Sequence, residues 1–203
     1  RERQEMADLP VDEVALKKYL GVDQLVGEPD CSTVERKTAR PTLDVNGIWG
    51  GFAGEGAKTI IPAKAGAKVS MRLVPDQRAA TINELFKNFV YSIAPAGVTI
   101  QISEMHGSDP VLVERDQPAV QAAARAIEFG FGKSPVYIRE GGSIPIVGLF
   151  KEMLGCKSIL LLGWGSPDDG AHSPNERFSL EDFHRGILSA AALCYALEES
   201  YGG

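Results

Sequence analysis

One polar loop of the chain gathers groups that could hold a metal ion. Residues 163–176 read Gly-Trp-Gly-Ser-Pro-Asp-Asp-Gly-Ala-His-Ser-Pro-Asn-Glu and include His172, one of three histidines in the chain, after the adjacent carboxylates Asp168 and Asp169. Imidazole and carboxylate groups are common zinc ligands, and glycines let the backbone approach an ion closely. A lone histidine is more often a structural residue, however, and an aspartate pair is more often a solvated turn. The loop marks His172 as a candidate metal ligand and leaves the structural interpretation open.

A second candidate site is the turn Arg139-Glu-Gly-Gly-Ser-Ile-Pro145, which joins a predicted strand to a predicted helix. The first N–H groups and the positive dipole end of a helix attract anions. Gly141 and Gly142 carry no side chain that would block an anion, and Ser143 adds a hydroxyl donor. A carboxylate fits this turn as well as a phosphate does. Ser143 as a simple N-cap is an equally good interpretation.

Arg72 and His106 are two further candidates for binding. Arg72 lies beside Lys68 and Ser70 on the polar face of an alternating segment, where its guanidinium could hold a carboxylate with two hydrogen bonds. Most arginines in such places are only solvated, and a structural turn is the simpler interpretation of His106. A hydrolytic zinc generally takes three protein ligands, so these residues alone do not form a catalyst.

The elements that must position these residues fall into two blocks. In the first block, alternation over residues 66–74 predicts a strand, and a helical apolar stripe from Ile82 to Val90 predicts a helix capped by Asp76. The remaining predictions are a helix at 11–20, an extended connection at 22–45, a glycine-rich strand or hairpin at 47–56 and a second strand at 98–102. Helix on one face and sheet on the other describe a small α+β layer.

The second block alternates helices and short strands. We expect helices at 117–129 and 144–154, strands at 136–138 and 158–162, and a polar loop at 163–178. A capping box at Ser179-x-x-Asp182 opens a last helix. Its predicted core face is Phe183, Ile187, Ala190, Cys194 and Leu197. This order is half of an α/β layered domain, which places a domain boundary near residue 108.

Composition excludes some classes of function. The 203 residues carry a formal net charge of −6, which argues against a nucleic-acid partner, and no apolar run approaches the roughly 20 residues of a membrane span. Three scattered cysteines predict free thiols in a reducing compartment, so we expect a cytoplasmic protein. The chain does not begin with methionine, which leaves the parent protein's start and targeting open.

Three motifs together resemble one enzyme family. Thr59–Pro75, Arg139–Pro145 and Asp168–Glu176 occur in order, as they do in the dinuclear zinc exopeptidases: carnosinases and other cytosolic dipeptidases, glutamate carboxypeptidases, and acetylornithine and succinyl-diaminopimelate deacylases. The resemblance is closest to the carnosinase-like dipeptidase branch and covers nearly the whole chain. It implies an α/β fold in which residues 1–108 are the later part of an α+β lid or dimerisation domain. Residues 109–203 would be the C-terminal part of an α/β layered catalytic domain.

The resemblance also assigns roles to single residues. His172 would bind one of two Zn²⁺ ions, with Mn²⁺ or Co²⁺ as alternatives. The substrate's C-terminal carboxylate would be bound by Arg72, Gly142 and Ser143. Thr59 and His106 would also line the substrate site, with lid residues reaching across to the active site of the partner subunit in a homodimer.

The resemblance places the catalytic base and the other metal ligands before this chain, so no catalytic residue is expected in it. We expect a zinc metallopeptidase that hydrolyses dipeptides or acyl-amino acids with a free carboxylate. The isolated chain should neither hydrolyse them nor hold two zinc ions tightly. Two alternatives stay open: a non-catalytic dimerisation or interaction module, and a small-anion binding domain built on the Gly141-Gly142-Ser143 turn.

Overall fold

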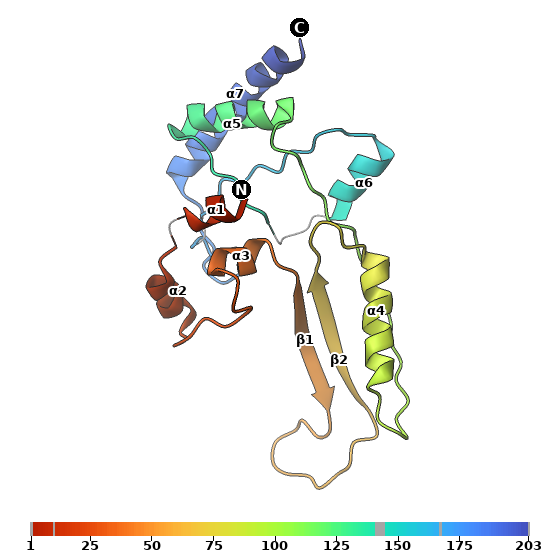
Figure 1. The fold of residues 1–203 in the computed structure, drawn as a ribbon. Coiled ribbons are helices and arrows are strands. Elements are labelled where there is room, and N and C mark those ends of the chain that lie inside the picture. Colours follow the sequence, from red (N-terminus) through yellow and green to blue (C-terminus); the bar gives the residue numbers. More distant parts are fainter. Residues whose placement is uncertain (1, 10, 141–144, 167, 203) are drawn as a thin grey trace. The chain divides into compact units, whose positions relative to one another are not determined.

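The computed structural model describes residues 2–9, 11–140, 145–166 and 168–202. It divides into two compact units (Figure 1). The first comprises residues 1–110 and 138–145, and the second comprises residues 111–137 and 146–203. None of the helices in the described ranges is both long and apolar enough to cross a bilayer.

The first unit begins with three short helices, α1 (Glu2–Ala7), α2 (Glu13–Leu20) and α3 (Thr33–Thr38). Helix α2 confirms the helix predicted at 11–20: the Asp12 carboxylate accepts from two amides of the first turn, and Gly21 ends the helix at φ 67°. The extended connection predicted at 22–45 is wrong where α3 forms. A capping box stabilises this six-residue helix, since the Ser32 hydroxyl accepts from the Glu35 amide and the Glu35 carboxylate accepts from the Ser32 amide.

A two-stranded antiparallel sheet follows, formed by β1 (Thr42–Gly50) and β2 (Ala65–Arg72). Thr42 pairs with Arg72 and Gly50 pairs with Ala65, with an irregularity between Val45 and Gly47. Strand β2 confirms the predicted alternating strand, and β1 confirms the glycine-rich strand predicted at 47–56 only as far as Gly50. Residues 51–64 connect the two strands as a long loop (Figure 1).

Helix α4 (Ala79–Ser92) confirms the predicted helix, but the predicted cap at Asp76 is wrong. Asp76 adopts φ 71° in the turn before the helix, and Arg78 occupies the N-cap without a side-chain hydrogen bond. The Ala79 amide instead donates to the Asp109 carboxylate, 2.8 Å away and 30 residues later. The strand predicted at 98–102 is also wrong: within the described ranges the sheet consists of β1 and β2 alone, so this segment has no ladder partner.

The second unit is built on α5 (Pro118–Phe131), α6 (Pro145–Met153) and α7 (Leu180–Tyr201). All three helices were predicted, and the Ser179 hydroxyl caps α7 by accepting from the Asp182 amide at 3.2 Å. The strands predicted at 136–138 and 158–162 do not form. Their apolar side chains predicted burial, yet Val136 is 70% and Leu161 63% exposed. Neither segment pairs with a strand in the described part of the chain.

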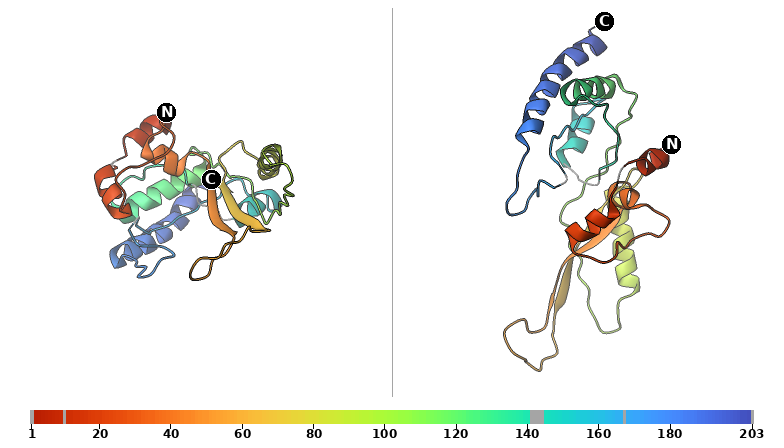
Figure 2. Two further views of the ribbon diagram at one scale, coloured as in Figure 1. Left: turned by 90° about the horizontal axis from the view of Figure 1, so that it is seen from below. Right: turned by 90° about the vertical axis from the view of Figure 1, so that its left-hand side faces the viewer.

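Small side chains form the contact between α5 and α7, which lie against each other in both views (Figures 1 and 2). The buried residues are Ala119, Ala122, Ala123 and Ala126 on α5, and Gly186, Ser189 and Ala196 on α7. The predicted core face of α7 is therefore wrong, since Phe183 and Ile187 on it are about half exposed. A Cβ added at Gly130 would lie 2.6 Å from the Arg185 carbonyl oxygen. The helices approach too closely for large side chains, and this approach selects the small face of α7.

Candidate functional site

The His172 loop, defined as residues 163–166 and 168–178, is anchored to the helix pair of the second unit. The Trp164 ring stacks on Phe131 of α5 with centroids 5.4 Å apart and planes at 26°. Trp164 also covers Gly186 of α7, where an added Cβ would lie 2.5 Å from the Trp164 Cδ1. Because Gly186 has no side chain, Trp164 can pack directly on α7. This contact fixes the base of the loop.

Asp169 ties the two ends of the loop together. Asp169 is only 8% exposed, and its carboxylate Oδ2 accepts a hydrogen bond from the Ser166 amide at 2.7 Å. The Asp169 amide donates to the Ser166 carbonyl at 3.1 Å, and its carbonyl accepts from the Arg177 amide at 2.9 Å. The sequence-based interpretation of the aspartate pair as a solvated turn is therefore wrong for Asp169.

The neighbouring Asp168 contributes less to the loop. It forms an ion pair with Arg177, but both side chains are more than 60% exposed. Exposed ion pairs contribute about 0–1 kcal/mol. A hydrogen bond to a charged group contributes about 1.5–3 kcal/mol, and that of Asp169 is part-buried. The loop's conformation consequently depends more on Asp169 than on the ion pair.

His172 is held in an unusual backbone conformation. Its φ is 63°, in the left-handed region that non-glycine residues rarely adopt. Such positions cost on the order of 1–3 kcal/mol and persist when the surrounding structure imposes them, often at functional sites. The His172 side chain is exposed, and within the described ranges its imidazole makes no hydrogen bond or ion pair. Both of its ring nitrogens are therefore without a partner among the described residues.

The described residues fit one ligand of a metal site. Among them, no three His, Cys, Asp or Glu side chains are grouped closely enough to hold an ion. The Asp168 carboxylate pairs with Arg177, and the Asp169 carboxylate accepts from the Ser166 amide. Cys31, Cys156 and Cys194 are free thiols, as the sequence predicts.

In the first unit, Arg72 and His106 lie at the same end of the hairpin and α4. Arg72 is the last residue of β2, and Ala79 begins α4 shortly after it. The segment that carries His106 runs back along α4: Glu104 forms an ion pair with Lys87, which raises the pKa of Lys87, and Asp109 accepts from the Ala79 amide. His106, between these two attachments, is exposed.

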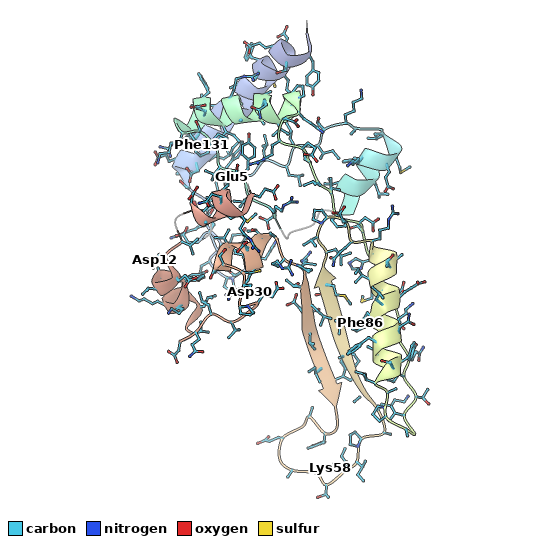
Figure 3. All side chains as sticks on the ribbon, in the orientation of Figure 1. Glu5, Asp12, Asp30, Lys58, Phe86 and Phe131 are labelled. Carbon is cyan, nitrogen blue, oxygen red and sulfur yellow. The ribbon has the colours of Figure 1, made fainter. Side chains whose placement is uncertain are left out.

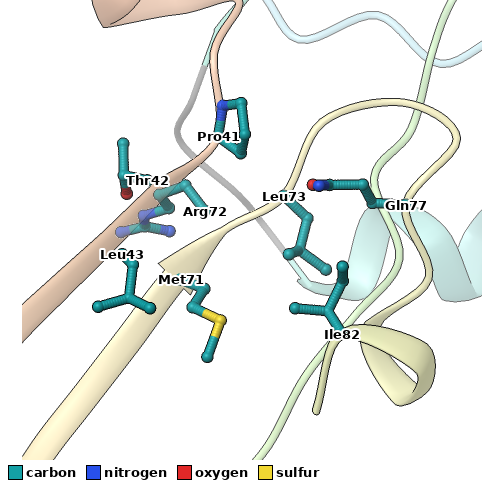
Figure 4. A pocket seen from close by; sticks show the side chains of 8 residues that line it. All are labelled: Pro41, Thr42, Leu43, Met71, Arg72, Leu73, Gln77 and Ile82. Atoms are coloured by element: carbon teal, nitrogen blue, oxygen red, sulfur yellow. The ribbon is translucent and has the colours of Figure 1, made fainter. Parts of the chain in front are cut away.

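A shallow pocket of about 210 Å³ lies at this end of the hairpin. Figure 4 shows the Arg72 guanidinium beside Thr42, with apolar side chains around it. The lining residues are Pro41, Thr42, Leu43, Met71, Arg72, Leu73, Gln77 and Ile82. A cationic fork beside an apolar wall suits a small ligand with one carboxylate and one apolar group.

Thr59 lies at the other end of the hairpin, in the loop at 51–64 next to Lys58, which Figure 3 labels near the tip. The eight residues of β2 separate the two ends by about 24 Å at the usual rise of a strand. Within this unit the structure thus brings Arg72 and His106 to one end and leaves Thr59 at the other.

Gly142 and Ser143, the predicted anion-binding residues, lie outside the described residues. The predicted turn begins at Arg139, whose guanidinium donates three hydrogen bonds to the Glu2 carboxylate: Nη2 lies 2.8 Å from Oε2 and 3.0 Å from Oε1, and Nε lies 3.0 Å from Oε2. Sequence analysis missed this pair, because 137 residues separate the partners and no local pattern links them.

A family model described as Peptidase family M20/M25/M40 matches residues 4–196. Among curated proteins, a Cys-Gly metallodipeptidase of Schizosaccharomyces pombe is 36% identical over 175 residues, which are 85% of this chain and 37% of that protein. The human Beta-Ala-His dipeptidase is 34% identical over 155 residues, which are 75% of this chain and 30% of that protein. The chain thus spans about a third of the length of these relatives.

Solved structures are similar over almost the entire chain. A metallo-carboxypeptidase of Sulfolobus solfataricus matches with a TM-score of 0.83 and 30% identity, over 97% of this chain and 45% of that one. The di-peptidase Dug1p of Saccharomyces cerevisiae matches with a TM-score of 0.80 and 30% identity, over 98% of this chain and 42% of that one. These matches confirm the predicted α/β fold and the predicted carnosinase-like dipeptidase branch.

Proposed function

Because the chain belongs to peptidase family M20/M25/M40, we propose that it is part of a zinc metallodipeptidase that hydrolyses substrates with a free C-terminal carboxylate. Dipeptides and acyl-amino acids are the proposed substrate class. The dipeptidase names of the relatives support this class. Residues 1–108 would belong to a lid and residues 109–203 to the catalytic domain of a longer, cytoplasmic protein.

The proposal rests mainly on the exposure and backbone conformation of His172. Its imidazole is exposed, and its backbone has a positive φ. Hydrogen bonds and an ion pair of Asp169 and Asp168 stabilise the loop that carries it. We assign His172 as one ligand of a two-zinc site, with Mn²⁺ or Co²⁺ as alternative metals, whose remaining ligands and general base lie outside this chain. His172 would help to hold a zinc ion, which when bound would supply Lewis-acid chemistry for hydrolysis of the amide bond.

Arg72 is the proposed carboxylate-binding residue, together with Gly142 and Ser143. Its place on the rim of a pocket with an apolar wall supports this role. His106 lies at the same end of the unit as Arg72, and we assign it to the substrate site. Thr59, at the opposite end of the hairpin, would serve the site of the partner subunit in a homodimer formed through the lid.

The proposed carboxylate role is tested with Arg72→Ala in the full-length protein. Loss of a hydrogen bond between charged groups costs about 1.5–3 kcal/mol, which is a loss of about 10- to 150-fold in kcat/KM for free dipeptides. The same dipeptides with an amidated C-terminus should lose far less. Lys68→Ala is the matched control, because Lys68 is an exposed cation on the same face of β2. Equal losses on free and amidated substrates would refute the carboxylate role.

A second candidate function, an interaction module, is favoured by one observation. Strand β1 exposes large apolar side chains, with Ile48 81% and Trp49 55% exposed. Analytical ultracentrifugation and metal analysis of the isolated 203-residue chain test whether it dimerises and whether it holds a metal ion by itself. A metal-free dimer without activity fits a chain that supplies the dimer contact and one ligand. Chelator-sensitive hydrolysis by the isolated chain would overturn our assignment of the other ligands to the rest of the protein.

A further inference from the structure

His172 occupies the third position of a tight turn inside its loop. The Ser173 amide donates to the Gly170 carbonyl at 2.9 Å, and the Ser173 hydroxyl donates to the same oxygen at 2.5 Å. A positive φ at the third position is what a type II turn requires, and glycine or asparagine usually provides it. Here a histidine adopts φ 63° at this position. We expect contacts elsewhere in the loop to add to the two Ser173 bonds in stabilising this conformation.

Asp169 is the residue placed to stabilise this turn. It immediately precedes Gly170, the first residue of the turn, and its own backbone and carboxylate are fixed by three hydrogen bonds to Ser166 and Arg177. Through Asp169, these bonds join Ser166, which precedes the turn, to Arg177, which follows it. The carboxylate is the only side-chain group among the three bonds, so a substitution can remove it without altering the backbone.

We propose that Asp169 is a positioning residue, whose buried carboxylate holds the loop so that His172 presents its imidazole to the metal ion. The inference rests on the proposed function, because it assumes that His172 is a ligand. Asp169 itself contacts no metal and no substrate in this scheme. The adjacent Asp168 has the same charge, but among the described residues its carboxylate contacts only the exposed Arg177, so its removal should leave the turn intact.

The test uses the full-length protein with Zn²⁺ as the probe, and measures Zn²⁺ affinity by competition with a chelator. Asp169→Ala should weaken Zn²⁺ binding about 10- to 100-fold, the usual effect of losing a group that orients a metal ligand. Asp169→Asn keeps an oxygen acceptor for the Ser166 amide and should retain most of the affinity. Asp168→Ala is the matched control and should change the affinity less than about fivefold, the upper end of the roughly 0–1 kcal/mol that an exposed ion pair contributes.

A double-mutant cycle separates positioning from general destabilisation. If Asp169 acts through His172, Asp169→Ala should weaken Zn²⁺ binding no further in a His172→Ala background. Hydrogen exchange gives a readout without metal: Asp169→Ala should accelerate exchange at the Ser166 amide, which loses its acceptor, while Asp168→Ala should not. Asp169→Glu, which moves the carboxylate by one methylene, replaces Asp169→Ala should that variant fail to fold.

The outcomes distinguish the two levels of inference. Additive losses in the cycle, an equal effect of Asp168→Ala, or unchanged exchange at Ser166 would each overturn the positioning role while leaving the proposed function intact. Unchanged Zn²⁺ affinity in His172→Ala would overturn the ligand assignment and the positioning role together.

Discussion

Gly186→Ala tests how the base of the His172 loop is fixed to the helices beneath it. Trp164 occupies the space above Gly186, so that a new methyl group would lie 2.5 Å from its Cδ1, 2.7 Å from its Nε1 and 2.8 Å from its Cγ. Ordinary contacts of a Cβ are 3.4–4 Å, and the indole must therefore retreat by about 1 Å or more. The retreat would take it out of its stacked position on Phe131.

Three effects determine the change in the free energy of unfolding. Replacing glycine by alanine inside a helix stabilises by about 1 kcal/mol. Overpacking costs about 1–3 kcal/mol, and loss of an aromatic pair costs a further 0.5–1.5 kcal/mol or so. The net expectation is a destabilisation of about 0.5–3.5 kcal/mol. Gly148→Ala in α6 is the matched control: nothing lies within 4 Å of the added Cβ, so this variant should gain about 1 kcal/mol.

Urea unfolding and tryptophan fluorescence measure these effects. The chain has two tryptophans, so in a Trp49→Phe background the emission reports Trp164 alone. Gly186→Ala should shift the emission to longer wavelength as the indole becomes solvated, and its unfolding free energy should lie about 1.5–4.5 kcal/mol below that of Gly148→Ala. An unchanged emission with a gain in stability equal to that of the control would refute the packing of Trp164 on Gly186.

Three further predictions follow from single contacts. Ser189→Ala should leave stability unchanged or raise it by about 1 kcal/mol in urea unfolding, because the buried Ser189 hydroxyl has no hydrogen-bond partner within the described residues; a marked loss would show that the hydroxyl is satisfied. Ser179→Ala should cost about 1 kcal/mol by the same measurement, because it removes the acceptor that caps α7, whereas no loss would contradict the cap. The hydrogen bonds from Arg40 hold the pKa of Glu28 below its usual value of 4.5, so this carboxylate stabilises the fold above the unfolded-state pKa and the contribution is lost as pH falls through the lowered pKa. Arg40→Gln should return the Glu28 pKa towards 4.5 in an NMR titration, and an unaltered titration would exclude the pair.

Periodicity predicted the helices well and the strands poorly, for a physical reason. A helix forms its backbone hydrogen bonds within itself, so the apolar stripe of α4 and the alanine-rich sequence of α5 were enough to predict these helices. A strand needs a neighbour, and the pattern over 98–102 says nothing about where that neighbour lies. Helix α3 was missed because it has six residues and no apolar stripe, although its Ser32–Glu35 capping box was a readable signal.

In the candidate site, too, residue types could be read from the sequence, but burial could not. The residue types around His172 marked it only as a candidate metal ligand. The resemblance to the exopeptidase family gave it that role, as it gave the roles of Arg72 and His106, and all three roles stay predictions. The importance of Asp169 over Asp168 could not be predicted, because burial separates two adjacent residues of the same type. The signal was the turn-forming sequence around them, which allows an aspartate to bond the backbone of its own turn.

The cap of α4 by Asp109 has a consequence for the order of folding. The first amide of this helix has no acceptor from its own N-cap and obtains one only when the chain has turned back over 30 residues. Closing such a loop is an entropic cost that must be met before the bond forms. The first turn of α4 should therefore become protected late, after the central turns of the helix, and simultaneously with the segment that carries His106. A folding measurement resolved by residue would see these two distant stretches acquire structure in a single step.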